Sequence, residues 1–576
     1  MITFRNPIAL AVVALTLLAC TPGPSASAPP ETANAPGEAV ESNRTLVAVV
    51  RTEPESLLVR PVIQSGSFAG LALMRRLANA ELTLLDDRLV RRPYLAETLP
   101  QIDSDTWRVF PDGQMETTWR LKPGIRWHDG VPLTAQDFVF AWSVYSRPEF
   151  GSAGSRSMRA IADVAALDER TIVVRYQQPY PSADDLSGQD GLPPLPRHLL
   201  EQPVRESDPA ALAVSPFWTR DYVGLGPYRV ERWEPGSYVE GVAFDQHTLG
   251  RPRIGRVRIM FVGDANTALA NLLAGTADFL GDSAIGFEQA MTLKSDWEKR
   301  GSGAILLRNS QWRATAFQLR PELATPPALL DVRVRKALAH AVDKPALRDN
   351  IYQGEMVVSD FLISPYSRWG PIAERGIVKY PYDLRRSEQL MTEAGFIRGT
   401  DGVFVGPGEA RFRAELKTAI SPDWVAEMAA MANEWRRAGF DVQDAVLPAA
   451  LSIDPEARVA FPGMFTSITS QGEATLEAFT TAQIPRVENR WRGGNNRGGW
   501  SNPEYDGLVT AFAATLEPNE RAAQLTQMAR IFTEELPMIS LLFLAQPYAR
   551  VAALQGVLPV APEGDITWNI HEWTFQ

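Results

Sequence analysis

The side chains that could do covalent or acid–base chemistry are few and scattered in this chain. It has one cysteine, Cys20, and its histidines are isolated from one another, at His128, His198, His247, His340 and His571. The patterns H-E-x-x-H, G-x-S-x-G and G-x-x-x-x-G-K-[ST] do not occur. The histidines lack the paired spacing of a metal site, and no signature of a nucleophile with its base is present, so the sequence predicts no metal site, no cofactor and no enzyme.

Cys20 stands at the end of what reads as an export signal. Arg5 gives a positive start, residues 8–18 are apolar, and small Ala19 precedes the thiol. The apolar run is shorter than the roughly 20 residues that a membrane-spanning helix needs. The ending resembles the lipobox of bacterial lipoproteins, which implies cleavage after Ala19 and a diacylglyceryl group on Cys20. The alternative is an ordinary secretory signal with a chance cysteine at its end.

Composition indicates an acidic protein with more than one lobe. The chain has 576 residues, 45% of them hydrophobic and 22% charged, with a formal net charge of −11. This length exceeds what one hydrophobic core normally supports. An acidic chain argues against general nucleic-acid binding, which needs clustered basic surface. Residues 21–43 are rich in Pro, Ala, Ser and Gly, which predicts a disordered tether.

Strand-like and helix-like patterns alternate after residue 44, which predicts an α/β protein. The clearest strands are expected at 45–50, 170–176 and 256–262, and the clearest helices at 266–273, 331–342 and 423–437. In the last of these helices, Trp424, Met428, Met431 and Trp435 recur at helical spacing. This stripe predicts a core-facing side of the helix rather than a cofactor site.

Residues 119–142, WRLKPGIRWHDGVPLTAQDFVFAW, form the most distinctive segment. Pro123-Gly124 and Asp129-Gly130 mark turns, so WRL and IRW are expected to be two strands of a hairpin. Thr134 and Asp137 have the spacing of a capping box, with Asp in place of Glu, at the start of a following helix. The turn accounts for His128, and the segment itself contains no chemistry.

This segment and an ordered set of others resemble the bacterial extracellular solute-binding proteins of family 5, which serve dipeptide, oligopeptide and nickel ABC importers. The other segments, in chain order, are LAE (95–97), LPRH (195–198), GLGPY (224–228), LLAGTADF (272–279), DVRVRKALAHAVDK (331–344), RSEQLMTEAGF (386–396) and WSNPEYD (500–506). Together they extend over nearly all of residues 45–545. Each motif is weak alone, and the ordered set is specific.

The resemblance implies a two-lobed periplasmic-binding-protein (Venus flytrap) fold of type II, with an extra N-terminal subdomain. The expected division is a lipoprotein signal peptide at 1–19, a tether at 20–43, a discontinuous lobe I at 44–69, 215–305 and 516–576, the extra subdomain at 70–214, and lobe II at 306–515. The implied protein is a monomer that captures a peptide or similar solute by hinge closure. It delivers this solute to the permease subunits of an ABC importer, in the periplasm or at the outer face of the cell membrane, held by the lipid on Cys20.

The family's anchors for a free dipeptide are missing from the aligned segments. In dipeptide binders a carboxylate grips the ligand's amino terminus and an arginine grips its carboxylate. The amine-binding region aligns with residues 463–473, where Glu473 is the only acid and falls several residues late. The arginine region aligns near residues 419–423, which contain no base. Because an unpaired buried charge is costly, longer or modified peptides, or an uncharged solute, are expected instead.

Candidate cleft residues are aromatic and small polar side chains near expected strand ends and loops. They are Ser65, Ser67, Phe68, Trp369, Phe465, Thr466, Asn495 and Trp500. Aromatic rings supply apolar contact and amides bond peptide groups, although core packing is the alternative for each aromatic residue. Two other functions stay open: an exported lipoprotein hydrolase, and a sensor that presents bound peptide to a signalling partner.

Overall fold

The computed structural model describes residues 44–58, 71–150, 155–188, 191–452, 454–559 and 564–576. These residues fall within one structural unit. Cys20 and the predicted tether lie outside the described residues, as do Ser65, Ser67 and Phe68.

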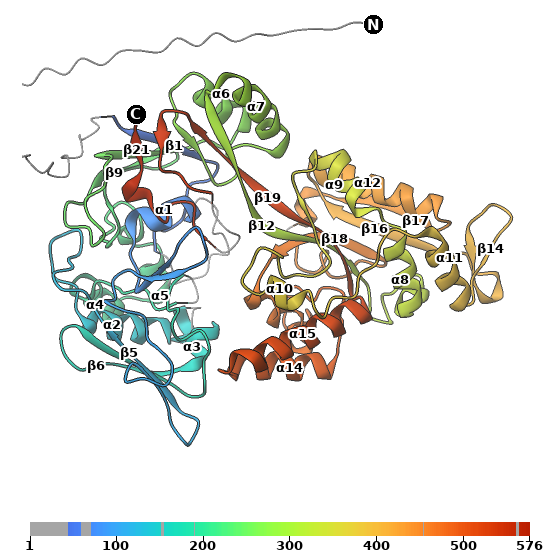
Figure 1. Cartoon of the computed structure of the whole chain (residues 1–576), viewed down its shortest axis with the longest axis horizontal. Coiled ribbons are helices and arrows are strands. Elements are labelled where there is room, and N and C mark those ends of the chain that lie inside the picture. Colours follow the sequence, from blue (N-terminus) through green and yellow to red (C-terminus); the bar gives the residue numbers. More distant parts are fainter. Residues whose placement is uncertain (1–43, 59–70, 151–154, 189–190, 453, 560–563) are drawn as a thin grey trace, which may run out of the picture. The chain divides into compact units, whose positions relative to one another are not determined.

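One large mixed sheet organises the chain (Figure 1). Its order is β17 (Asp441–Leu447), β16 (Arg413–Ala419), β18 (Met464–Ser470), β12 (Gly303–Phe317), β19 (Met538–Val551), β11 (Phe279–Leu280), β1 (Leu46–Val50), β10 (Arg256–Phe261), β9 (Tyr238–Ala243) and β8 (Tyr228–Glu234), with β13 (Val357–Val358) beside β19. Strands β1, β10 and β11 form one parallel group, and β16, β17 and β18 form another. The long antiparallel pair β12 and β19 joins the two groups. The predicted strands at 45–50 and 256–262 are confirmed as β1 and β10.

Helices cover both faces of the sheet around β16 and β18. Consecutive residues Met464 and Phe465 of β18 enter two different cores, as the alternation of side chains along a strand requires. The core that contains Met464 includes residues of α8 (Val332–His340), α9 (Lys344–Tyr352), α11 (Leu384–Glu393) and α12 (Pro422–Arg437). The predicted core face of α12 is confirmed for Met428, Met431 and Trp435, which are at most 1% exposed. It is wrong for Trp424, which is half-buried and lines a cavity.

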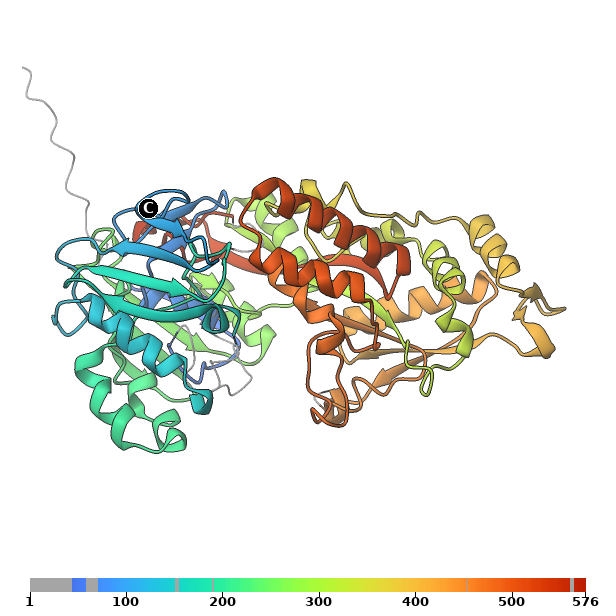
Figure 2. The ribbon, with the colours of Figure 1, turned by 90° about the horizontal axis from the view of Figure 1, so that it is seen from below.

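The core that contains Phe465 includes residues of α10 (Gly370–Ala373), α14 (Pro503–Ala514) and α15 (Pro518–Glu535). Helices α14 and α15 lie side by side, at the red end of the colour scale in Figure 2. The predicted division assigned residues 516–576 to lobe I. Phe532 of α15, however, packs against the rings of Trp500 and Tyr505, so α15 belongs with the segment 306–515.

A separate four-stranded sheet lies within residues 107–176. Its order is β4 (Trp107–Val109), β5 (Met115–Arg120), β7 (Thr171–Tyr176) and β6 (Ile161–Ala166), accompanied by α2 (Ala135–Tyr145), α3 (Arg156–Ala160), α4 (Arg197–Glu206) and α5 (Pro209–Ala213). The predicted strand at 170–176 is confirmed as β7. The predicted IRW strand is wrong, because residues 125–127 lie between two turns and form only a single bridge, between Arg126 and Pro132. The helix start is confirmed: Asp137 accepts from the Thr134 N–H at 2.9 Å.

The remaining elements are short or flank these sheets. They are α1 (Leu71–Ala78), β2 (Thr83–Leu85), β3 (Arg91–Pro93), α6 (Ala265–Leu273), α7 (Phe287–Arg300), β14 (Ile397–Arg398), β15 (Phe404–Val405), α13 (Ala449–Ser452), β20 (Leu554–Gln555) and β21 (Thr574–Phe575), with short 3₁₀ turns between them. Asp264 caps α6 by accepting from the Thr267 N–H at 2.8 Å, which confirms the helix predicted at 266–273.

His128 joins two of the sequence motifs. Its Nδ1 accepts from the Gly224 N–H at 3.2 Å, and its Nε2 lies 2.9 Å from the Gly226 carbonyl oxygen. A Cβ on Gly226 would lie 2.4 Å from the backbone of Ala78, so only glycine permits this close approach to the end of α1. Burial lowers the pKa of His128 to about 4, and the neutral ring serves as a structural bridge.

Candidate functional site

A cavity of about 470 Å³ lies beside the end of β18 and is the candidate site. Arg75 and Arg76 of α1 line one side, and Trp369, Gln471 and Glu473 line another. Gln471 directly follows β18, which is parallel to its neighbour β16. Ligands of open α/β sheets bind beyond the carboxyl ends of parallel strands, which is where this cavity lies.

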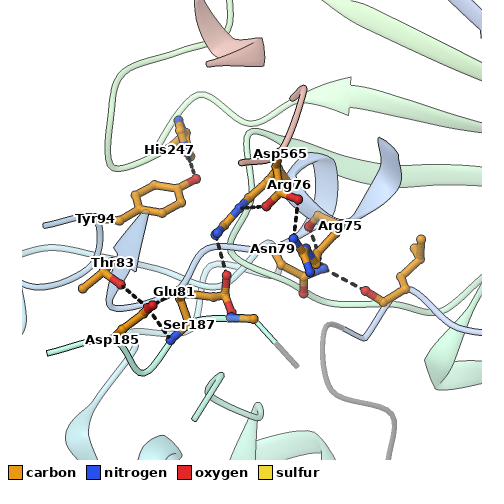
Figure 3. Close-up of polar contacts among 12 residues, drawn as sticks. Arg75, Arg76, Asn79, Glu81, Thr83, Tyr94, Asp185, Ser187, His247 and Asp565 are labelled. Atoms are coloured by element: carbon orange, nitrogen blue, oxygen red, sulfur yellow. Dashed lines mark hydrogen bonds and ion pairs between the residues drawn. The ribbon is translucent and has the colours of Figure 1, made fainter. Parts of the chain in front are cut away.

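The α1 side of the cavity is an ion-pair network, drawn in Figure 3. Arg75 and Arg76 both bond Asp565, and the Arg76 Nε–Asp565 Oδ2 distance is 3.1 Å. Arg76 also pairs with Glu81 at 2.5 Å. Helix α1 presents these two cations because Leu73, Met74 and Leu77 fix it in the core, at 1–5% exposure. Guanidinium groups held in this way cannot turn away from the cavity.

The carboxylates of this network differ in pKa because their surroundings differ. Burial alone would raise the pKa of Asp565, but Arg75, Arg76 and Arg308 lower it to about 2. Burial outweighs Arg76 at Glu81, whose pKa is raised. Asp565 is therefore ionised at neutral pH and neutralises part of the positive charge of Arg75 and Arg76.

Asp282 adds a weakly solvated carboxyl next to the same helix. Its Oδ2 accepts from the Leu73 N–H at 2.8 Å, and Oδ1 is buried without a hydrogen-bond partner among the described residues. Burial raises the pKa of Asp282 to about 6. Because the fold disfavours its ionised form, Asp282 lowers the free energy of unfolding at neutral pH.

A second ion-pair group lines the cavity near β3. Arg91 donates to Asp184 and to Asp185, each at 2.7 Å. Asp185 and Arg91 face the cavity, and the side chains of both aspartates are about 30% exposed. One guanidinium between two carboxylates leaves a local surplus of one negative charge.

On the β18 side, three arginines surround the carboxylate of Glu473. Arg521 donates to Oε1 at 2.6 Å, Arg156 lies 3.5 Å from the same oxygen, and Arg368 donates to Oε2 at 3.0 Å. The Trp369 Nε1–H also donates to Oε2, at 2.8 Å. Burial alone would raise the pKa of Glu473, but the three arginines lower it.

Gln471 has a free acceptor at the cavity. Its Nε2 donates to the Asn309 carbonyl oxygen, whereas its Oε1 is buried and has no partner among the described residues. A buried acceptor without a donor costs free energy, so a donor from a bound solute would be favourable here.

Adjacent to Glu473, a cavity of about 350 Å³ separates α3 from the 3₁₀ turns after β18. Arg159 of α3 donates to Glu477 at 2.7 Å across it. With the Arg156–Glu473 contact, this makes two charged contacts between residues 156–159 and residues 473–477.

A further cavity of about 330 Å³ lies beside β12 and β19, lined by Gln311, Gln546, Asp423 and Trp424. Asp423 lies in the first turn of α12, and burial and Glu288 raise its pKa. Residues 419–423 contain no base, and Asp423 is the one of them that lines this cavity.

The structure gives different surroundings to the cleft residues predicted from sequence. Trp369 lines the candidate cavity, and Asn495 is half-buried and bonds Thr469 on β18. Phe465 and Trp500 are 2% and 4% exposed within the core, which matches the packing alternative. Thr466 is fully buried and bonds Thr315 at 2.8 Å.

The histidines show no metal chemistry in the part of the chain that the structure describes. No three histidine, cysteine, aspartate or glutamate side chains gather there as a metal site would require. His247 bonds the Tyr94 hydroxyl at 2.8 Å, and burial lowers its pKa to about 4 (Figure 3). His198 pairs with Asp129 at 2.6 Å.

The arginines at the cavity and around Glu473 were not predicted from the sequence. Arg75, Arg76, Arg91 and Arg368 line the cavity, and Arg156 and Arg521 contact Glu473. Apart from the adjacent pair Arg75 and Arg76, these residues lie far apart in the chain, and arginine alone predicts a solvated surface. The one available indication was Glu473, the single acid of its segment.

Comparison with known proteins identifies the family. Residues 97–483 match the bacterial extracellular solute-binding proteins, family 5 Middle. The chain belongs to this family. Among family 5 relatives, a protein of Brucella ovis described as an ABC transporter peptide-binding protein is 26% identical over 297 residues. That match covers 50% of this chain and 51% of the Brucella protein, so the chain spans about half the length of this relative.

A second relative matches over most of both chains. The oligopeptide-binding protein AppA of Bacillus subtilis is 23% identical over 501 residues, covering 85% of each chain. Among solved structures, NikZ of Campylobacter jejuni in complex with Ni(L-His) superposes with a TM-score of 0.72 at 24% identity, covering 92% of this chain and 99% of NikZ. The likeness confirms the two-lobed family 5 fold predicted from sequence. Among the described residues, no helix has the length and apolar character needed to cross a bilayer.

Proposed function

We propose that this chain captures a peptide between its two lobes and delivers it to an ABC importer, without catalysis. The observation that carries the proposal is the candidate cavity, whose wall combines residues of α1 with residues that follow β18. Family membership supports solute binding, and the names of the Brucella and Bacillus relatives support peptides as the solute.

The strand arrangement supports capture by hinge closure. Within the described sheet, only β12 and β19 lie between the two parallel groups, and their register shifts between Asn309 and Gln311. A two-strand connection with an irregularity fits a hinge, because strands bend where regular pairing is interrupted. The Arg159–Glu477 pair would form only when the lobes are closed.

The ion pairs at the cavity support a ligand other than a free dipeptide. The carboxylate of Glu473 is engaged by three arginines. The one ionisable residue of the segment 419–423 is Asp423, an acid that lines the separate cavity beside β12 and β19. Longer or modified peptides do not need both end contacts of a free dipeptide.

The N-terminal sequence supports a membrane tether. We propose that Cys20 carries lipid and holds a monomer at the outer face of the cell membrane or in the periplasm. A tether keeps the receptor at raised local concentration near its permease subunits.

The proposal is tested by ligand-dependent stability of the purified protein. A ligand that binds only the folded state stabilises it by RT ln(1 + [L]/Kd), about 2.7 kcal/mol at 100 times Kd. Peptide mixtures of graded length should raise the melting temperature, whereas free amino acids should not. If no peptide mixture shifts the melting temperature, the receptor proposal fails.

A further inference from the structure

The surroundings of Glu473 carry a surplus of positive charge. Arg156, Arg368 and Arg521 contact this one carboxylate, which leaves a local excess of two positive charges. We call these four residues the arginine cage. Glu477, the next acid along the chain, is engaged by Arg159.

The arginine cage prevents Glu473 from anchoring an amine. Both oxygens of the Glu473 carboxylate already accept charge-assisted hydrogen bonds from arginine, and Oε2 also accepts a hydrogen bond from the Trp369 Nε1–H. An ammonium group brought to this carboxylate would also approach the three guanidinium groups that contact it. Repulsion would then outweigh attraction.

The other charged groups of the cavity do not cancel this surplus. Arg75 and Arg76 are balanced by Asp565 and Glu81. Arg91 with Asp184 and Asp185 leaves one negative charge, on the β3 side of the cavity. The cavity is therefore positive at the cage and negative near β3.

Part of the cage is exposed in the absence of a ligand. The Arg368 side chain is 52% exposed and lines the cavity, while the side chain of Arg521 is 8% exposed and its Nε has no hydrogen-bond partner among the described residues. A ligand that fills the cavity would remove water from Arg368. Burying an uncompensated charge is costly, so an anionic group on the ligand would be strongly favoured.

We infer that the solute of this protein is anionic, and that a carboxylate of an acidic peptide binds the arginine cage. This inference rests on the proposed function. A glutamate that anchors an amine would select a positively charged group of the ligand, whereas the arginine cage selects a negatively charged one. Charge-assisted hydrogen bonds from Arg368 to the ligand carboxylate supply the selectivity for acidic over neutral or basic peptides.

The test uses three pools of N-acetylated peptide amides of matched length that contain one Glu, one Gln or one Lys. Capped ends remove all other charges, so the pools differ only in the one side chain. Titration calorimetry on the protein should show the Glu pool binding at least about tenfold more tightly than the Gln pool, with the Lys pool weakest.

Two variants and a control assign the preference to the cage. Arg368→Gln should reduce the preference for Glu over Gln about fivefold or more. Glu473→Gln should strengthen binding of the Glu pool, whereas an amine anchor would show no such gain with capped peptides and would lose binding of free-amine peptides. Arg300→Gln is the matched control, because Arg300 is 70% exposed and pairs with Asp296 on α7. Melting curves establish that each variant is folded.

Equal or tighter binding of the Gln or Lys pool would overturn the inference and leave the proposed function standing. An unchanged preference in Arg368→Gln would also overturn it. If no pool and no free-amine peptide binds, the proposed function itself fails, and the inference fails with it.

Discussion

The contact between Arg159 and Glu477 should control how often the lobes close. The pair is 2.7 Å long, and its side chains are 52% and 38% exposed. An exposed pair of this kind contributes about 0.2–1 kcal/mol. Arg159→Glu loses that attraction and adds a repulsion of similar size, so closure should weaken by about 0.4–2 kcal/mol in total. The closed-to-open ratio should fall about 2- to 30-fold.

Because the sequence has a single cysteine, the closed-to-open ratio can be measured by fluorescence energy transfer between two introduced cysteines. With Cys20 replaced by Ser, cysteines at Leu167 and Ile397 are the only thiols, and these positions are 65% and 68% exposed. Arg159→Glu should lower the high-transfer population, and the charge swap Arg159→Glu with Glu477→Arg should restore most of it. At 1 M salt the difference should shrink, because the Debye length is about 3 Å. The reasoning is refuted if Arg159→Glu matches the parent, or if the swap behaves like the single variant.

Three further predictions concern stability and anchoring. The pKa of Asp282 is about 6, against 3.8 in an ordinary carboxyl, so this group destabilises the fold as pH rises from about 4 to 6. Asp282→Asn should therefore raise the urea unfolding free energy by about 3 kcal/mol at pH 8 and change little at pH 3.5; equal effects at both pH values would contradict this. Glu427→Gln should lower the unfolding free energy by about 3–5 kcal/mol in the same assay, because it breaks a fully buried ion pair in which Arg313 Nε lies 2.9 Å from Glu427 Oε1. A loss below about 1 kcal/mol would contradict the assignment of a buried ion pair. Cys20→Ser should move the protein from the membrane to the soluble fraction while its binding of peptides is unchanged, and retention in the membrane would argue against a lipid on Cys20.

Sequence periodicity predicted the elements whose pattern is local. The stripe on α12 and the β-branched run of β1 are examples, because one helix face or one short buried strand determines each pattern. The ordered motifs predicted the family, and His128 with Gly226 shows why they recur together: they hold the hairpin against the end of α1.

The cavity could not be predicted in the same way. Phe465 and Trp500 have the residue types of cleft aromatics, but which face of β18 or side of a loop meets solvent depends on distant elements such as α15. Glu473 obtains its partners from Arg156 and Arg521, which are 317 and 48 positions away in the chain. Long-range pairs of this kind leave no spacing to recognise.

Mass spectrometry of small molecules released from the protein purified out of its native host tests solute capture most directly. The account predicts a set of peptides longer than two residues, enriched in Asp and Glu, that disappears when the protein is unfolded and washed before refolding. Recovery of free dipeptides or a metal complex alone would contradict the assignment of the solute. A consistently empty protein that no added peptide stabilises would contradict the account as a whole.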